Sequence, residues 1–170
     1  MPVKIQRALI TESPEALLAQ YGDDIMHSAK FLQMKQYRQH RNSTAYDHSV
    51  QVAITAIQMA KKRKLQVDAK SLVRGCLLHD YWCYDCHAKG HPGWHLFLHG
   101  IRAAKNAEQD FGINFLEADM ITNHMWPLHP FRFPISVEAW LLCLADKKVS
   151  ILERFPKKKK EREKAVETTK

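Results

Sequence analysis

The stretch Gly75-Cys76-Leu77-Leu78-His79-Asp80 decides how this chain is interpreted. It continues an apolar spacing that starts at Leu72 and Val73, which predicts a buried helix ending near His79-Asp80. A carboxylate at the end of a buried helix is costly unless it is paired with another charged group or bound to a metal ion. The surroundings of the His-Asp pair therefore indicate a special role, although the dipeptide alone is common.

Three other apolar segments carry a similar residue at one end. His48 precedes the apolar stripe over residues 50–60, His124 follows Ile121, and Asp146 follows the most apolar run of the chain, residues 139–145. Four separate helices thus bring an imidazole or a carboxylate to an apolar end, as in the metal centres of helical bundles. Mixed imidazole and carboxylate ligation suits Fe, Mn, Zn, Co or Ni, and we expect a divalent ion of this group.

Each of these residues also has an ordinary structural explanation. A single buried histidine is more often a hydrogen-bonded core residue than a ligand, and a buried aspartate is more often an N-cap or an ion-pair partner. Asp146, for example, directly precedes Lys147 and Lys148. The coincidence of four such residues favours a shared metal site over four independent structural roles.

The apolar spacing is helical along most of the chain. It predicts a short helix starting at Ser13-Pro14, a second over 22–38, and longer helices over about 50–64, 68–80, 98–110, 116–125 and 136–154. No segment has the period-two alternation of a half-buried strand. We therefore expect an all-α fold, a compact bundle of about six to eight helices with a metal site between them.

Length and charge fit one domain with a short appendage. The 170 residues, 45% of them hydrophobic, suffice for a core without disulfides. We expect residues 1–40 to form N-terminal helices packed on the core, 41–155 to form the catalytic core, and 156–170 to form a basic, disordered tail. This tail has seven basic and three acidic residues and so contributes much of the net charge of +8. The charge therefore suits an anionic small molecule more than nucleic acid.

The sequence predicts a cytoplasmic protein without membrane contact. The first ten residues carry Lys4 and Arg7 within their apolar stretch, unlike a signal peptide, and the longest apolar run is too short to span a bilayer. The oligomeric state is left open by the sequence.

Residues 82–97 hold Gly90, Pro92 and Gly93 among aromatic residues and histidines, which predicts a long loop with a functional role. The loop contains the haem-attachment pattern Cys83-Tyr84-Asp85-Cys86-His87, and His91 would complete a set of four zinc ligands. Covalent haem attachment requires export, for which no signal is seen, and structural zinc sites take their ligand pairs from separated segments. Two free cysteines in a loop are the favoured interpretation.

Taken together, these residues resemble the H…HD…D signature of the HD superfamily of metal-dependent phosphohydrolases. Tyr46-Asp47-His48-Ser49 is similar to the first motif of that family, residues 75–80 to the second, and Leu144-Ala145-Asp146-Lys147 to the last, so the resemblance covers roughly residues 40–155. His99-Gly100 and Ile121-Thr122-Asn123-His124 resemble further segments of the branch that binds two metal ions. The resemblance implies one or two ions and two ligand sets bridged by Asp80: His48, His79, Asp80 and Asp146 for one ion, and His99 and His124 for the other.

The resemblance also implies a reaction. Metal-activated water would attack a phosphoester or phosphoanhydride of a nucleotide-like substrate. We expect catalytic roles for Asp80, for Lys147 as a phosphate-binding charge, and for His95 as an acid or base, with His91 and His129 as further candidates. Four aromatic residues have two open roles, stacking on a base or packing within the protein: Trp82, Tyr84, Trp94 and Trp126.

Two other functions stay open at this point. Some di-iron proteins of the same superfamily are oxygenases, and a non-enzymatic module could use residues 157–170 to contact nucleic acid or an acidic partner. A phosphohydrolase acting on an anionic, phosphate-containing small molecule is the function that we expect.

Overall fold

The computed structural model describes residues 5–40, 43–82 and 95–155, with the backbone alone at residues 40 and 95–97. Most of the predicted long loop and the whole of the predicted basic tail lie outside these residues. The interpretations of Cys83, Tyr84, Cys86, His87, His91 and Trp94 therefore stay predictions.

The described residues form eight α-helices, one 3-10 helix and four very short strands, which confirms the prediction of an all-α fold. The helices are α1 (Pro14–Tyr21), α2 (Asp23–Met26), α3 (Ala29–Leu32), η1 (Gln33–Gln36), α4 (Ala45–Lys62), α5 (Ala69–Leu78), α6 (His95–Phe111), α7 (Phe115–Asn123) and α8 (Val137–Arg154). The strands are β1 (Ala8–Leu9), β2 (Arg38–His40), β3 (Ser43–Thr44) and β4 (Gln66–Val67), and they form two antiparallel pairs, β1 with β4 and β2 with β3. Strands of two or three residues are too short to show a period-two pattern in the sequence.

The single helix predicted over residues 22–38 is wrong. The hydroxyl of Ser28 donates to the carbonyl of Ile25 at 2.9 Å and accepts the N–H of Phe31 at 3.2 Å, so it lies between α2 and α3. Serine hydroxyls compete for backbone hydrogen bonds in this way and favour helix starts over helix interiors. Two helix starts also differ, since α4 begins at Ala45 and not near residue 50, and α6 begins at His95 and so includes the end of the predicted loop 82–97.

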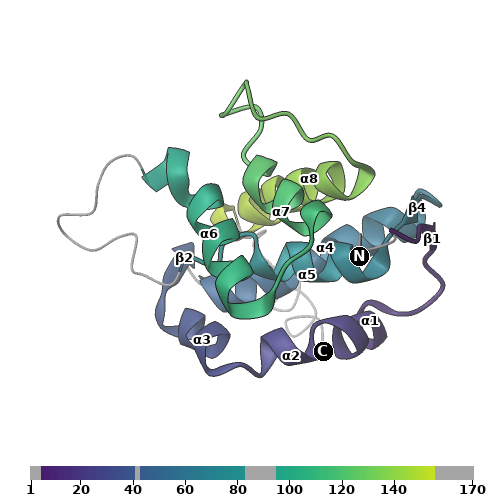
Figure 1. Ribbon diagram of the computed structural model, residues 1–170, viewed down its shortest axis with the longest axis horizontal. Coiled ribbons are helices and arrows are strands. Elements are labelled where there is room, and N and C mark those ends of the chain that lie inside the picture. The colour runs from purple at the N-terminus through teal and green to yellow at the C-terminus, as the bar shows by residue number, and fades with distance from the viewer. Residues whose placement is uncertain (1–4, 41–42, 83–94, 156–170) are drawn as a thin grey trace, which may run out of the picture.

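The long helices pack around α4, which contacts α5 and α8. α7 completes the bundle by packing against α5, α6 and α8. Figure 1 shows α1, α2 and α3 along the lower edge of the molecule, with α7 and α8 on the other side of α4 and α5. The buried face of α4 repeats at helical spacing, with Val52, Ala53, Ala56, Ile57 and Ala60 fully or almost fully buried.

Two glycines allow α7 to approach its neighbours closely. A Cβ atom at Gly75 of α5 would lie 2.6 Å from Cε of Met120, and one at Gly100 of α6 would lie 3.0 Å from the carbonyl oxygen of Ile121. The second contact is with backbone, which cannot move aside as a side chain can. Gly100 therefore sets how near the N-terminal half of α6 comes to the C-terminal end of α7.

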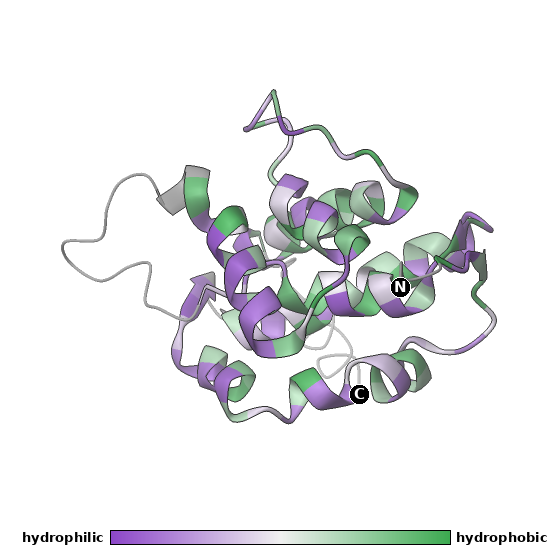
Figure 2. Cartoon of the chain, in the orientation of Figure 1, coloured by the Kyte–Doolittle hydropathy of each residue, from purple (hydrophilic) through white to green (hydrophobic). Residues whose placement is uncertain are grey.

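The surface of α6 shows which side of the helix faces the bundle. Ala103 and Ala107 are fully buried, whereas Lys105 and Glu108 are exposed. Figure 2 shows this as alternating hydrophobic and hydrophilic stretches along the helix. No helix in the described part of the chain is long and apolar enough to cross a membrane.

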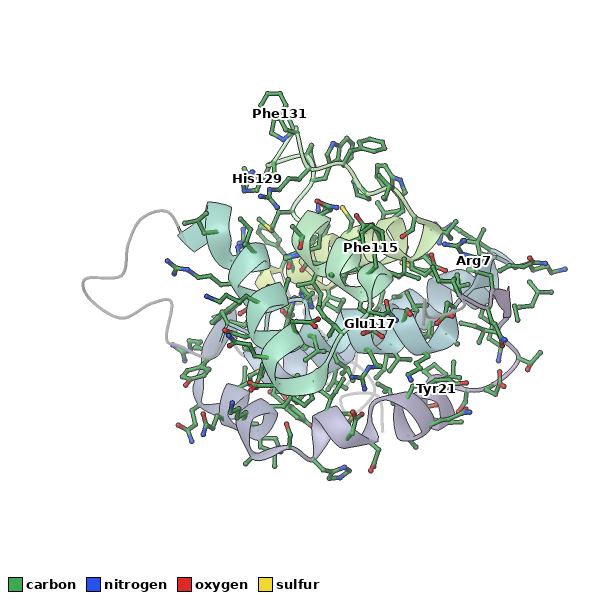
Figure 3. The ribbon with its side chains drawn as sticks, viewed as in Figure 1. Arg7, Tyr21, Phe115, Glu117, His129 and Phe131 are labelled. Atoms are coloured by element: carbon green, nitrogen blue, oxygen red, sulfur yellow. The ribbon has the colours of Figure 1, made fainter. Side chains whose placement is uncertain are left out.

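The connection between α7 and α8 is held by three aromatic rings. The ring centroids of Trp126, Phe133 and Trp140 lie 5.0–5.6 Å from one another in edge-to-face arrangements. Phe131 is fully exposed at the tip of this connection, with His129 beside it (Figure 3). These contacts favour packing over base stacking for Trp126.

The start of α4 is defined by a capping box. The hydroxyl of Thr44 accepts the N–H of Asp47 at 3.2 Å, and the Asp47 carboxylate accepts the N–H of Thr44 at 3.3 Å. This reciprocal pair satisfies two backbone donors that a helix start leaves open. It also places the first turn of α4, on which His48 lies.

We expect Thr44→Ala to lower the free energy of unfolding by about 1 kcal/mol, because the substitution removes the capping oxygen. Urea denaturation followed by circular dichroism measures the change. Thr44→Ser keeps the hydroxyl and is the matched control. Equal stability of the two variants would contradict this role of the side chain.

Candidate metal centre

Six predicted ligands lie together where the ends of α4, α5, α6 and α7 meet the middle of α8. His48 is on the first turn of α4, His79 and Asp80 directly follow α5, His99 is on α6, His124 directly follows α7, and Asp146 is on α8. The first five are at most 5% exposed, and the side chain of Asp146 is 13% exposed. The structure thus brings all six side chains into one buried cluster.

One half of the cluster lies between α4, α5 and α8. His48 Nε2 is 3.1 Å from Asp146 Oδ1, and His79 Nε2 is 3.9 Å from the same oxygen. Asp80 Oδ2 lies on the same side, 3.3 Å from His79 Nε2 and 3.9 Å from His48 Nε2. Two imidazoles and two carboxylates therefore face one point, which is a donor set that suits a divalent transition metal.

The other half lies between α5, α6 and α7. Asp80 Oδ1 is 3.6 Å from His99 Nε2 and 3.6 Å from His124 Nε2, and these two nitrogens are 3.0 Å apart. Asp80 thus directs one oxygen at each half of the cluster. This is the arrangement needed for a carboxylate that bridges two ions.

The backbone sets the tautomer of two of the histidines. His79 and His124 are the C-cap residues of α5 and α7. Each donates through Nδ1 to the carbonyl three residues earlier, His79 to Cys76 at 2.8 Å and His124 to Ile121 at 2.6 Å. Because Nδ1 carries the hydrogen, the lone pair of Nε2 faces the cluster, as it does in metal-binding histidines.

Two buried polar atoms of the cluster that lack hydrogen-bond partners in the described part of the chain also fit a metal ion. Among the described residues, His79 Nε2 and Asp80 Oδ1 have no hydrogen-bond partner although both atoms are buried. A buried polar atom without a partner costs free energy, and a cation between these electron-rich atoms would remove that cost. Two groups of three residues, which share His79, could each hold an ion, because within each group the ligand atoms lie within 4.8 Å of one another. The groups are His48, His79 and Asp146, and His79, Asp80 and His124.

The surroundings of His48 and His124 shift the pKa values of these two imidazoles in opposite directions. Burial alone would lower the pKa of His48, but the hydrogen bonds to Asp146 and Glu153 outweigh it and raise the pKa to about 10. A proton then occupies His48 Nε2, where a metal ion would bind. Burial together with repulsion from His99 and His79 lowers the pKa of His124 to about 3, so this imidazole is neutral at pH 7 and its lone pair is available.

The two aspartates are ionised at neutral pH. Burial alone would raise the pKa of each, but the neighbouring imidazoles, led by His79 for Asp80 and by His48 for Asp146, hold both pKa values well below the usual range. Both carboxylates are therefore available as anionic ligands.

Three side chains at the cluster were missed by the sequence reasoning, and one of them is Ser150, whose hydroxyl donates to Asp146 Oδ1 at 3.2 Å. Glu153 accepts a hydrogen bond from His48 Nδ1 at 2.9 Å, and Gln39 donates from Nε2 to Asp80 Oδ2 at 2.6 Å. Glu153 had a signal in the sequence, since it lies seven residues after Asp146 and so on the same face of α8. Gln39 had none, because its position depends on the β2–β3 hairpin.

The remaining predicted catalytic residues are placed as follows. Lys147 Nζ is hydrogen-bonded to the carbonyl of His124 at 3.1 Å and lies 3.1 Å from Cys143 Sγ, so it links α8 to the residue that follows α7. His95 begins α6, one turn before His99, and its side chain is not among the described atoms. His129 is half-buried on the α7–α8 connection (Figure 3). Catalytic roles for these three stay predictions.

A cavity of about 680 Å³ lies at the other end of α5 and α7. It is lined by residues at the N-terminal ends of these helices, among them Ser71, Arg74, Asn114 and Glu117, and by Tyr21 of α1. Arg74, which lines this cavity, is five residues before His79, so about 7.5 Å of helix separates the cavity from the His-Asp cluster. Glu117 and Tyr21 mark it in Figure 3.

Comparison with known proteins gave one match. A family model described as "HD domain" matches residues 45–149, a range that includes all six residues of the cluster and excludes Gln39 and Glu153. A search of curated proteins and a search of solved structures found no similar protein.

We expect Asp80→Ala to abolish the binding of both ions, because this carboxylate faces both halves of the cluster, and His124→Ala to abolish the binding of one. The measurement is metal content by mass spectrometry after loading with Mn²⁺ or Co²⁺ and dialysis. His27→Ala, in which the replaced side chain is 75% exposed, is the control. Full occupancy in Asp80→Ala would refute the assignment of this residue.

Glu153→Ala should weaken the binding of the ion at His48 by about 10- to 100-fold, because a carboxylate on the second nitrogen of a metal-binding histidine orients the ring and raises its basicity. Competition with a coloured chelator gives the affinity. Glu108→Ala, at an exposed position of α6, is the matched control. If both variants bind metal like the unmodified protein, Glu153 has no part in the site.

Proposed function

We propose that this chain, which belongs to the HD domain family, is a phosphohydrolase that cleaves a phosphoester or phosphoanhydride bond of a nucleotide-like substrate. The family consists largely of metal-dependent hydrolases, and the cluster of histidines and aspartates is the part of this chain that fits such a role.

The observation that carries the proposal is the position of Asp80 between two groups of imidazoles. Its two oxygens face different halves of the cluster, at 3.3 Å from His79 Nε2 and at 3.6 Å from His99 and His124. Metal ions bound there would lower the pKa of a water molecule and neutralise phosphoryl oxygens. The protein contributes the fixed spacing of the donors and their burial.

The chain's own side chains keep the donors oriented. Backbone carbonyls hold the rings of His79 and His124, and Glu153 holds the ring of His48. Because these rings are buried and their second nitrogens are occupied, they do not need to reorganise when substrate binds. Such preorganisation is a main source of rate acceleration in enzymes.

The charge of the site supports an anionic substrate. Asp80, Asp146 and Glu153 are the carboxylates in contact with the cluster, and two divalent ions would exceed their combined negative charge by one. Basic residues occur nearby in the chain, with Arg38 beside Gln39 on β2 and Arg102 one turn after His99 on α6. A phosphate group suits both features.

Proton transfer to the leaving group is assigned to His95, the first residue of α6. It lies four residues before His99, about one helical turn, so the two positions share a face of α6. We assign Lys147 a role in positioning His124, because its ammonium group is hydrogen-bonded to the backbone carbonyl of that residue.

The test is hydrolysis of a panel of nucleoside mono-, di- and triphosphates, cyclic nucleotides and dinucleoside polyphosphates, with Mn²⁺, Fe²⁺, Co²⁺, Ni²⁺ or Mg²⁺, in which the nucleotide products are separated by chromatography and any free phosphate is measured. We expect at least one substrate to be turned over and Asp80→Asn to lose that activity, while His95→Gln retains its metal and turns over more slowly. The assay is run with and without oxygen, since a di-iron oxygenase would require it. A fully loaded protein that hydrolyses nothing in the panel would contradict the proposal and favour a non-enzymatic role.

A further inference from the structure

Gln39 reaches the cluster from outside the region that the family model matches. It lies on β2, which pairs with β3 in a short hairpin directly before α4. The hairpin is fixed to the helix by the hydrogen bond from Ala45 N–H to the Tyr37 carbonyl at 2.8 Å and by the Thr44 cap. The backbone at Gln39 is therefore tied to the same helix start that carries His48.

The Gln39 side chain makes a direct contact with the bridging carboxylate. Its Nε2 donates to Asp80 Oδ2 at 2.6 Å, across 41 residues of sequence. Asp80 is 3% exposed, and apart from the imidazoles of the cluster Gln39 is the described residue whose side chain hydrogen-bonds its carboxylate. The Gln39 amide does not compete with a metal ion for Oδ2, because each carboxylate oxygen has two lone pairs.

The orientation of the Asp80 carboxylate has to be set by a neighbour. Rotation about the terminal bond of aspartate is broad and has little preference of its own, so the plane of the two oxygens is decided by what they contact. Oδ1 must face His99 and His124 at the same time as Oδ2 faces His79. A donor on β2 that fixes the position of Oδ2 therefore also fixes the plane of the carboxylate.

We propose that Gln39 is a positioning residue that keeps Asp80 in its bridging orientation, so that binding of the ion at His99 and His124 depends on the Gln39 amide. The proposal rests on the proposed function only in taking the cluster as a two-metal centre, and it does not depend on which substrate is cleaved. It assigns to the N-terminal segment a part in completing the site.

The experiment is a titration of the metal-free protein with Co²⁺, followed by visible absorption, together with chelator competition for Mn²⁺. Gln39→Met keeps the volume of the side chain without its donor, and Gln39→Asn keeps the amide but shortens its reach. Gln36→Met, at an exposed position three residues earlier, is the matched control. Thermal unfolding of each variant shows whether it folds.

In both Gln39 variants we expect the second equivalent of metal to bind about 10- to 100-fold more weakly, with the first equivalent nearly unchanged. The Co²⁺ spectrum of the second site should change with it, and Gln36→Met should behave like the unmodified protein. Unchanged affinity for both equivalents, or an equal loss at both, would overturn the proposal, and so would an unmodified protein that binds a single ion. Two ions bound normally without hydrolysis of any substrate in the panel would count against the proposed function alone.

Discussion

The geometry of the His-Asp cluster depends on the burial of ionised carboxylates among imidazoles. Asp80 is almost completely buried, and its Oδ1 has no hydrogen-bond partner among the described residues. Burying an uncompensated charge costs several kcal/mol, and replacing such groups by apolar ones is often neutral or stabilising. A core at the meeting point of five helices has no structural need for this arrangement. The cost is understandable if the cluster serves to bind cations.

The same helices that form the core also deliver the cluster, and α5 and α7 do so through their C-terminal ends. α5 and α7 are capped at their starts by Asp68 and Asn114 and end at His79 and His124. The final carbonyls of a helix lack backbone donors, and here the two imidazoles supply them. One hydrogen bond thus completes the helix and at the same time fixes the tautomer of a ligand. Gly100 permits α6 to lie close enough to α7 for His99 to meet His124.

The cluster extends beyond the segment that defines the family. Glu153 follows the matched residues 45–149 and Gln39 precedes them, and each contacts one residue of the cluster. Glu153 contacts the imidazole of His48 and Gln39 contacts the carboxylate of Asp80, so segments on both sides of the matched region supply supporting contacts to the cluster. The β2–β3 hairpin thus has a role in the architecture of the site, although it is too short to alter the fold class.

The sequence alone determined the helical fold and pointed to most residues of the cluster, because both depend on local patterns. Apolar residues at helical spacing predict which segments are helices, and His79-Asp80, His124 and Asp146 stand out since they are polar residues at apolar ends. Only the tertiary structure decided what depends on distances between segments. The break of the N-terminal helix at Ser28, the division of the Asp80 oxygens between two halves, and the hydrogen bond from Lys147 to the His124 carbonyl belong to this class. So does the contact of Gln39 with Asp80, because a side chain on a three-residue strand carries no periodic signal and its partner is set by how the hairpin packs.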